Sequence, residues 1–202
     1  MLKLDLSNNN LVGTIPEELY KLTNIQKVYL FKNNLTGTIS SQIGNLDSIT
    51  HFHLSHNNLI GNIPNELKSD NNGIRPLEYF NVYSNQLTGT IPDDLRLRNV
   101  IYFDIGRNSL TGKLPNDIGT KFISLRHLYL DHNDFRGTIP DSYNTVGNGR
   151  LESFSIDHNR FTGTVPGERS MYNKLVQYTL HSNQFDRIDS DNCRIEVPQG
   201  EC

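Results

Sequence analysis

Apolar and polar residues alternate in short segments that recur along the whole chain. The first segment reads Leu4-x-Leu6-x-x-Asn9-x-Leu11-x-Gly13, followed by Ile-Pro, and this order of residue types returns in seven further segments. A period of two is typical of a β-strand with one buried face. A strand this short cannot bury that face alone. The pattern therefore predicts a stack of parallel strands, each covered by its neighbours.

Every segment contains an asparagine just after its alternating apolar residues, and successive asparagines are 23 to 28 residues apart. We expect each carboxamide to pair with backbone groups that would otherwise be buried without partners where the chain turns. In register, the side chains would form a structural ladder that consists of Asn9, Asn33, Asn57, Asn85, Asn108, Asn133, Asn159 and Asn183. The glycine and proline after the asparagine are also interpreted as structural, although Ser40 replaces the proline of the second segment and Arg187 the glycine of the last.

Eight segments cover residues 1–188 and predict one continuous α/β repeat solenoid. The chain contains no alanine, the best helix former, so we expect a strand-rich and helix-poor architecture. Residues 189–202 depart from the repeat and are predicted to form a C-terminal cap. No N-terminal cap precedes the first strand. We therefore expect the chain to be part of a longer protein or to need a partner at that end.

The repeat resembles the plant-type leucine-rich repeats of receptor-like kinase ectodomains and polygalacturonase-inhibiting proteins, with similar algal and protist arrays. The resemblance lies in the ending L-[ST]-G-x-[IL]-P and covers nearly the whole chain. It implies a right-handed, curved superhelix, with a parallel sheet on the concave face and 3₁₀ turns or short strands on the convex face.

The same resemblance implies an extracellular or cell-surface location, with a disulfide between Cys193 and Cys202. The alternative is a cytoplasmic protein with free thiols. Asn34 begins the single glycosylation sequon of the chain. No apolar run is long enough to cross a bilayer and no signal peptide is visible, so any membrane anchor would belong to a longer parent protein.

The polar strand positions are expected to point out of the core onto the concave face. They hold all seven histidines and five of the nine tyrosines. Equivalent residues of adjacent strands lie about 4.8 Å apart, so these side chains would form one patch. The predicted partner-binding residues are Tyr29, Phe31, His51, His53, Tyr79, Tyr83, Tyr102, Arg107, His127, Tyr129, Asp131 and His158.

Exposed aromatic side chains with a polar tip are enriched at interfaces. The patch therefore predicts a non-catalytic module that binds a protein or peptide. The plain alternative is that large side chains merely fill an inward-curved sheet. The histidines, with an ordinary pKa near 6.5, would make the face basic in an acidic compartment. They could also bind a metal ion, but a flat sheet is not expected to wrap one, so no metal site is predicted.

Other function classes fit the sequence less well. The net charge of −3 argues against nucleic-acid binding, and no nucleotide, metalloprotease or hydrolase motif is present, so neither cofactor nor catalysis is predicted. Ser153, His127 and Asp157 share the concave face, but an open groove offers no oxyanion hole. Threonine columns, or the His-rich face, suggest the alternative of an ice- or polysaccharide-interacting solenoid.

Overall fold

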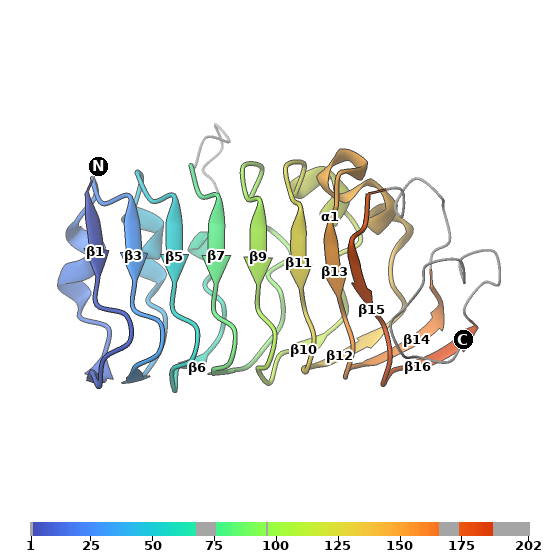
Figure 1. Cartoon of the computed structure of the whole chain (residues 1–202), viewed down its shortest axis with the longest axis horizontal. Helices are drawn as coiled ribbons and strands as arrows, with labels where there is room; N and C mark the ends of the chain where they lie inside the picture. The colour runs from blue at the N-terminus through green and yellow to red at the C-terminus, as the bar shows by residue number, and fades with distance from the viewer. Residues whose placement is uncertain (1, 68–75, 96, 166–173, 188–202) are drawn as a thin grey trace.

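The computed structural model describes residues 2–67, 76–95, 97–165 and 174–187. One parallel sheet of eight short strands runs along it, with neighbouring strands in chain order (Figure 1). The strands are β1 (Lys3–Asp5), β3 (Lys27–Tyr29), β5 (His51–His53), β7 (Tyr79–Asn81), β9 (Tyr102–Asp104), β11 (His127–Tyr129), β13 (Ser153–Ser155) and β15 (Gln177–Thr179). Each strand pairs with its equivalent one repeat away, which confirms the predicted repeat solenoid.

Shorter strands and tight helices complete the repeats. Parallel pairs form between β2 (Val12–Thr14) and β4 (Asn34–Thr36), and between β6 (Ile60–Gly61) and β8 (Gln86–Leu87). A four-stranded sheet consists of β10 (Thr111–Gly112), β12 (Asp134–Gly137), β14 (Arg160–Thr164) and β16 (Gln184–Arg187). The helical turns are η1 (Glu17–Lys21), η2 (Ser41–Asn45), η3 (Asn65–Leu67), η4 (Asp141–Gly149) and α1 (Ile118–Lys121).

The core is a continuous stack of side chains from the middle of each strand. Phe52 lies against Phe80 with ring centroids 6.4 Å apart, and Phe80 lies 5.4 Å from Phe103. All three are fully buried. Burial of each aromatic side chain stabilises the folded chain by about 1.5–3 kcal/mol, and it is buried only because the next repeat covers it.

The asparagine side chains join each repeat to the one before it. Asn57 Nδ2 donates to the carbonyls of Leu54 and Leu30 at 3.0 Å, and its Oδ1 accepts from the Leu35 N–H at 3.0 Å. Equivalent bonds are made by Asn33, Asn85, Asn108, Asn133, Asn159 and Asn183. The side chain of Asn9, in the first repeat, donates instead to two carbonyls of its own turn, those of Leu6 and Ser7.

Threonine methyl groups pack over the glycines of the outer strands. Gly61 has a φ of +79°, and a Cβ placed there would lie 2.8 Å from Thr38 Cγ2. Gly37, Gly112 and Gly163 meet Thr14, Thr90 and Thr138 in the same way. The threonine columns therefore have a packing role that follows from the absence of a side chain on the next glycine.

Ser40, which replaces a proline, also has a structural explanation. Its backbone N–H, which proline lacks, donates to the hydroxyl of the fully buried Tyr20. Its side chain accepts from the Gln42 N–H and so caps η2.

Three predictions remain untested by the structure. The expected cap at residues 189–202 and the disulfide between Cys193 and Cys202 lie outside the described residues. Asn34 lies in β4 and is exposed, and its glycosylation stays a prediction.

Candidate functional site on the concave sheet

The strand register places seven of the twelve predicted binding residues in two columns. The first column contains Lys27, His51, Tyr79, Tyr102 and His127, one from each successive strand. The second contains Tyr29, His53, Asn81, Asp104 and Tyr129 in the same strands. Because every pairing is parallel and in register, residues about 25 positions apart become lateral neighbours.

Five rings form a continuous chain of contacts, which we call the aromatic path: Phe31, His53, Tyr79, Tyr102 and Tyr129. Phe31 stacks on His53 with centroids 4.3 Å apart, and His53 meets Tyr79 edge-on at 5.4 Å. Tyr79 stacks on Tyr102 at 4.5 Å, and Tyr102 lies 5.4 Å from Tyr129. All five are half-buried. The path crosses five consecutive strands, a span of about 20 Å.

His51, His127 and Tyr29 flank the aromatic path. His51 stacks against Tyr79 at 5.7 Å, and His127 lies 5.7 Å from Tyr102. Tyr29 meets Phe31 edge-on at 6.5 Å. Tyr29, His51 and His127 thus form one surface with the aromatic path, and the role of these residues in binding stays a prediction.

Asp104 lies beneath the path and is buried, contrary to the expectation of an exposed acid. Only 6 % of its surface is accessible. Its Oδ2 accepts from the Tyr102 hydroxyl at 3.1 Å and from Asn81 Nδ2 at 3.3 Å, and its Oδ1 accepts from the Gly106 N–H at 3.1 Å. Burial raises the pKa of Asp104 to about 7, although the hydrogen bonds from Gly106 and Tyr102 oppose the shift.

Burial perturbs the pKa of two histidines on the concave face. Burial lowers the pKa of His53 to about 4, with a smaller contribution from the nearby His56. Burial also lowers the pKa of His51. Because its pKa is near 4, the His53 imidazole stays neutral in mildly acidic solution, which corrects the expectation that all seven histidines would become charged together.

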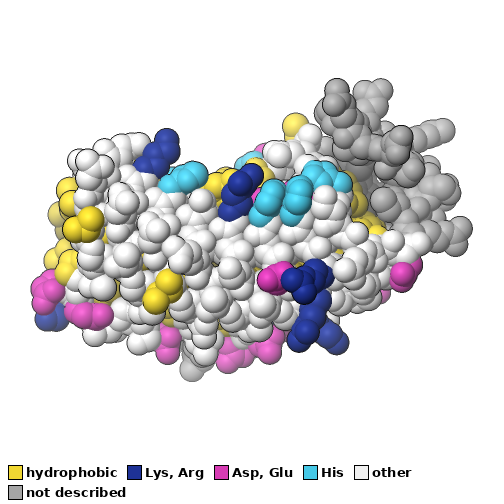
Figure 2. Space-filling model, turned by 90° about the horizontal axis from the view of Figure 1, so that it is seen from below, with side chains coloured by type: hydrophobic (Ala, Val, Ile, Leu, Met, Phe, Trp, Pro, Cys, Tyr) yellow, Lys and Arg dark blue, Asp and Glu magenta, His cyan; other side chains and the backbone are white. Residues whose placement is uncertain are grey.

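The residue before each ladder asparagine adopts a left-handed conformation that the sequence analysis missed. These residues have φ between 47° and 57°: Asn8, Lys32, His56, Ser84, Arg107, His132, His158 and Ser182. We call Lys32, His56, Arg107, His132 and His158 the basic rim. Lys, Arg and His side chains gather along the upper edge of the surface in Figure 2. Arg107 lies over the Tyr83 ring, 6.0 Å from its centroid, and His56 meets that ring edge-on.

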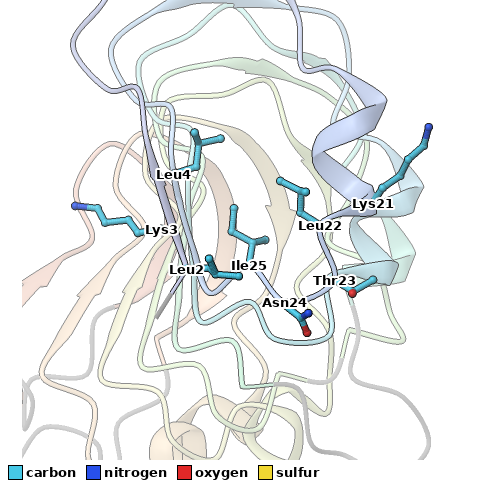
Figure 3. A pocket seen from close by; sticks show the side chains of 8 residues that line it. All are labelled: Leu2, Lys3, Leu4, Lys21, Leu22, Thr23, Asn24 and Ile25. Carbon is cyan, nitrogen blue, oxygen red and sulfur yellow. The ribbon is translucent and has the colours of Figure 1, made fainter.

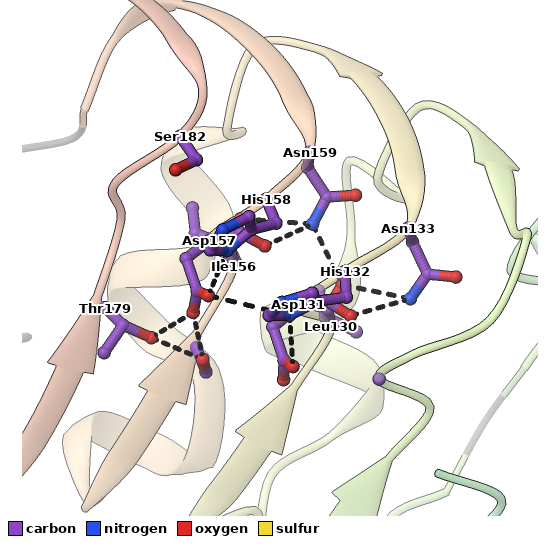
Figure 4. A network of polar contacts seen from close by, with 12 residues as sticks. Leu130, Asp131, His132, Asn133, Ile156, Asp157, His158, Asn159, Thr179 and Ser182 are labelled. Atoms are coloured by element: carbon purple, nitrogen blue, oxygen red, sulfur yellow. Dashed lines mark hydrogen bonds and ion pairs between the residues drawn. The ribbon is translucent and has the colours of Figure 1, made fainter. Parts of the chain in front are cut away.

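Asp157 is the second buried acid and contacts the end of the basic rim (Figure 4). Its Oδ2 lies 2.9 Å from His158 Nδ1, and its Oδ1 accepts from the hydroxyls of Ser155 and Thr179. Burial raises its pKa, but the hydrogen bonds from Thr179, His158 and Ser155 outweigh burial and lower it to about 2. Asp131 Oδ2 lies 3.1 Å from His132 Nδ1 in the neighbouring repeat.

A hollow lies at the first repeat, away from the aromatic path (Figure 3). It has a volume of about 420 Å³ and lies between β1 and the segment after η1. Four of its eight lining residues are aliphatic, namely Leu2, Leu4, Leu22 and Ile25. Leu2 and Leu22 are 59 % and 49 % exposed. None of the predicted partner-binding residues lines this hollow.

The repeats that build this surface also match a known sequence family. The Leucine Rich Repeat family model matches residues 1–22, 24–46, 48–69, 76–97 and 124–145, which together exceed half of the chain. The chain belongs to the leucine-rich repeat family. Its two concave-face columns therefore occupy the outward-pointing strand positions of a leucine-rich repeat sheet. A search of curated proteins gives no match.

Solved leucine-rich repeat structures from plants are similar to this chain. The ectodomain of the Arabidopsis thaliana receptor kinase GASSHO1/SCHENGEN3, in complex with CASPARIAN STRIP INTEGRITY FACTOR 2, is 32 % identical, with a TM-score of 0.83 over 92 % of this chain and 22 % of that one. The Arabidopsis receptor kinase HAESA, in complex with the peptide hormone IDA and the co-receptor SERK1, is 26 % identical, with a TM-score of 0.68 over 92 % and 34 %.

A plant ice-binding protein shares the fold at 22 % identity, with a TM-score of 0.67 over 92 % of this chain and 65 % of that one. The chain thus spans about a fifth to a third of the two receptor ectodomains. Among the residues that the structure describes, no helix is long and apolar enough to cross a membrane.

Proposed function

We propose that this leucine-rich repeat chain is a non-catalytic recognition module that binds a peptide or protein segment along the aromatic path. The carrying observation is the unbroken contact of five half-buried rings across five strands. A span of about 20 Å accommodates roughly six residues of extended peptide. Rings held by their neighbours lose little conformational freedom on binding, so they act as rigid anchors.

The similar structures support a peptide or protein as the ligand. Two of them are receptor ectodomains in complex with a peptide hormone or a named protein factor. By analogy we place this chain outside the cell, as part of a receptor-like or secreted inhibitor-like protein with an anchor, if any, in a longer parent. In that setting Cys193 and Cys202 would be joined by a disulfide.

A catalytic function is not favoured by the polar groups on the concave face. Ser153 Oγ lies 3.1 Å from His127 Nδ1, but His127 Nε2 is 3.8 Å from Glu152, whose other oxygen is paired with Arg126. The N–H groups of His127 and Ser153 donate to backbone carbonyls of the sheet, so they are not available as oxyanion donors. Asp157 instead bonds to Ser155, Thr179 and His158.

The ice-binding alternative is also less favoured. The threonine methyl groups of Thr38 and Thr90 fill the space over the next glycine, which accounts for their recurrence without a ligand. Asn62 and Lys113 interrupt the column and take the same place over Gly89 and Gly137. An ice-binding surface would need a regular, flat array of like groups. The similarity to the plant ice-binding protein concerns the fold alone.

The experiment is a selection from a displayed library of random linear peptides, followed by affinity measurements on the chosen peptide. We expect Tyr79→Ala and Tyr102→Ala each to weaken binding by about tenfold or more, because buried aromatic anchors carry most of the binding free energy. Tyr79→Phe keeps the stacked ring and should retain most of the affinity.

The controls are Arg136→Ala in β12 and Thr38→Ala after the end of β4, at positions that are both exposed. We expect the affinity of both to match that of the unmodified chain. Selected peptides that bind equally well to the two tyrosine variants would contradict the proposal, as would a library that yields binders sensitive only to the outer-strand variants.

A further inference from the structure

Two imidazoles and a carboxylate converge at the end of the basic rim (Figure 4). His132 and His158 occupy the left-handed position after β11 and β13, and Asp157 precedes His158. One ligand atom from each of the three lies within 4.8 Å of the other two. Asp157 Oδ2 is 2.9 Å from His158 Nδ1 and 3.8 Å from His132 Nδ1. The repeat geometry, rather than a local sequence motif, brings these groups together.

We propose that His132, Asp157 and His158 form a binding site for a divalent transition-metal ion, with Zn²⁺ as the ion to be tested. Two imidazole nitrogens and one carboxylate oxygen form a donor set that suits zinc. With zinc–ligand distances of about 2.0–2.2 Å, tetrahedral donor atoms lie roughly 3.3–3.5 Å apart. The two observed donor separations, 2.9 and 3.8 Å, lie on either side of this range.

The carboxylate is already oriented for such a role. Asp157 Oδ1 accepts from Ser155 Oγ at 2.7 Å and from Thr179 Oγ1 at 2.5 Å. These bonds fix the carboxylate plane and leave Oδ2 directed toward the imidazoles. Partners behind a metal ligand orient it and hold it ready for the ion. Asp157 is itself buried, so its position is set by packing as well as by these bonds.

The two imidazole rings need one small adjustment. They stack with centroids 4.0 Å apart and 17° between their planes, so one ring must turn for both nitrogen lone pairs to meet a single ion. His158 is exposed and His132 half-buried, and a turn about a terminal ring torsion meets a broad energy well. The turn also takes His132 Nδ1 away from Asp131 Oδ2, its present partner at 3.1 Å.

The surrounding charges favour a dication. Asp131 and Asp157 are both carboxylates, whereas neutral imidazoles carry no charge. His181 Nε2 lies 3.9 Å from Asp157 Oδ2, so a third imidazole stands beside the site. An ion bound by three donors keeps a position for water, for His181 or for a group from a partner. The inference does not depend on peptide binding at the aromatic path.

The test is calorimetric titration of ZnCl₂ into the untagged 202-residue chain. Cys193→Ser and Cys202→Ser are introduced into every sample so that thiols do not compete for the metal. We expect one saturable site per chain. The double variant His132→Gln with His158→Gln should lose at least about tenfold in affinity. The matched control, His51→Gln with His53→Gln, removes another histidine pair from the same face and should leave the affinity unchanged.

Cobalt substitution gives a second readout that does not depend on heat. The Co²⁺-loaded chain should show visible absorption of nitrogen and oxygen coordination, and Asp157→Asn should weaken it while circular dichroism shows a folded chain. No saturable site in the parent chain would overturn the proposal. Equal losses of affinity in the two histidine double variants would also overturn it, because zinc would then bind histidines without regard to their geometry.

Discussion

Asp104 holds a ring of the aromatic path through its hydrogen bond from Tyr102, but the burial of its carboxylate lowers the stability of the folded chain. Its carboxylate is buried beneath the Tyr79 and Tyr102 rings, where it accepts three hydrogen bonds but has no cationic partner among the contacts that determine its pKa. Burying an unpaired charge is costly, so the group takes up a proton more readily than in water.

The pKa of Asp104 predicts a specific pH dependence of stability. It is raised from its ordinary value of 3.8 to about 7, so between these values the folded state keeps a proton that the unfolded chain loses. The contribution of Asp104 to the free energy of unfolding should therefore fall by roughly 2–4 kcal/mol as the pH rises from about 4 to about 7. Urea unfolding of the parent chain and of Asp104→Asn at several pH values measures this difference.

The free energy of unfolding of Asp104→Asn must be subtracted from that of the parent chain at each pH, because His53 changes the stability of both chains in the opposite direction. Its pKa is lowered from 6.5 to about 4, so its contribution to stability increases over much of the same pH range. Asp47→Asn serves as the control for replacing a carboxylate at an exposed position. A parent-minus-Asp104→Asn difference that stays constant from pH 4 to pH 7 would show that Asp104 titrates as an ordinary acid.

Glycine at a left-handed outer-strand position offers a second prediction at this scale. Gly61→Ala should lower the free energy of unfolding by about 1–3 kcal/mol, because Ala is strained at a φ of +79° and its Cβ would meet Thr38 Cγ2. Gly13 has a φ of +84° with nothing within 4 Å of an added Cβ, so Gly13→Ala should cost only about 1–2 kcal/mol of backbone strain.

Thermal or urea unfolding distinguishes the backbone strain at positive φ from the clash of the added Cβ with the Thr38 methyl group. Adding Thr38→Ser to Gly61→Ala removes the clashing methyl group and should recover part of the lost stability. If the serine substitution recovers nothing, the threonine columns need an explanation other than packing over glycine.

At the scale of the element, the ladder asparagines set the cohesion between repeats. Asn133 is buried, and its carboxamide bonds to the carbonyls of Leu130 and Ile105 and to the N–H of Leu110. Asn133→Ala would leave these backbone groups buried and unpaired. We expect a loss of about 2–4 kcal/mol in the free energy of unfolding, measured by urea denaturation.

Asn9 is the matched control for this prediction. Its side chain is exposed and donates to the carbonyls of Leu6 and Ser7 in its own turn, so Asn9→Ala should cost about 1 kcal/mol or less. Equal losses at the two positions would contradict the view that the bonds between repeats carry the stabilisation.

The strands and the ladder were predictable because the same repeat pattern determines both where each strand lies in the chain and which strands become its neighbours. Once the period-two pattern and the asparagine spacing are seen, the parallel register follows, and with it the neighbours of Tyr79 and Tyr102. The burial of Asp104 and Asp157 was not predictable, because both occupy outward-pointing positions of their strands. They are covered by side chains of adjacent repeats, such as Tyr102 and Thr179, whose rotamers the pattern does not specify.

The left-handed turn was missed for a different reason. The position before each ladder asparagine holds Asn, Lys, His, Ser or Arg, and Lys, Ser and Arg are not familiar signals for positive φ. The repeated backbone of the stack imposes this conformation on all of them. Consequently the convergence of His132 with His158 and Asp157 depends on a backbone feature that the residue types did not reveal.

At the scale of the whole molecule, the solenoid holds its functional groups on a rigid lattice. The aromatic path, the basic rim and the hollow at Leu2 and Leu22 occupy separate parts of it. Because strand neighbours fix every ring of the aromatic path, a ligand would meet a surface that is already arranged for it, with little ordering cost on this side of the interface.

The central claim, that the concave aromatic path is the ligand-binding surface, is tested most directly by hydroxyl-radical footprinting of the chain with and without a selected peptide. We predict that Tyr79, Tyr102 and Tyr129 become protected from oxidation when the peptide is bound, while Val12 and Ile60 of the outer strands keep their reactivity. Protection of Val12 and Ile60, with the three tyrosines unchanged, would contradict the account.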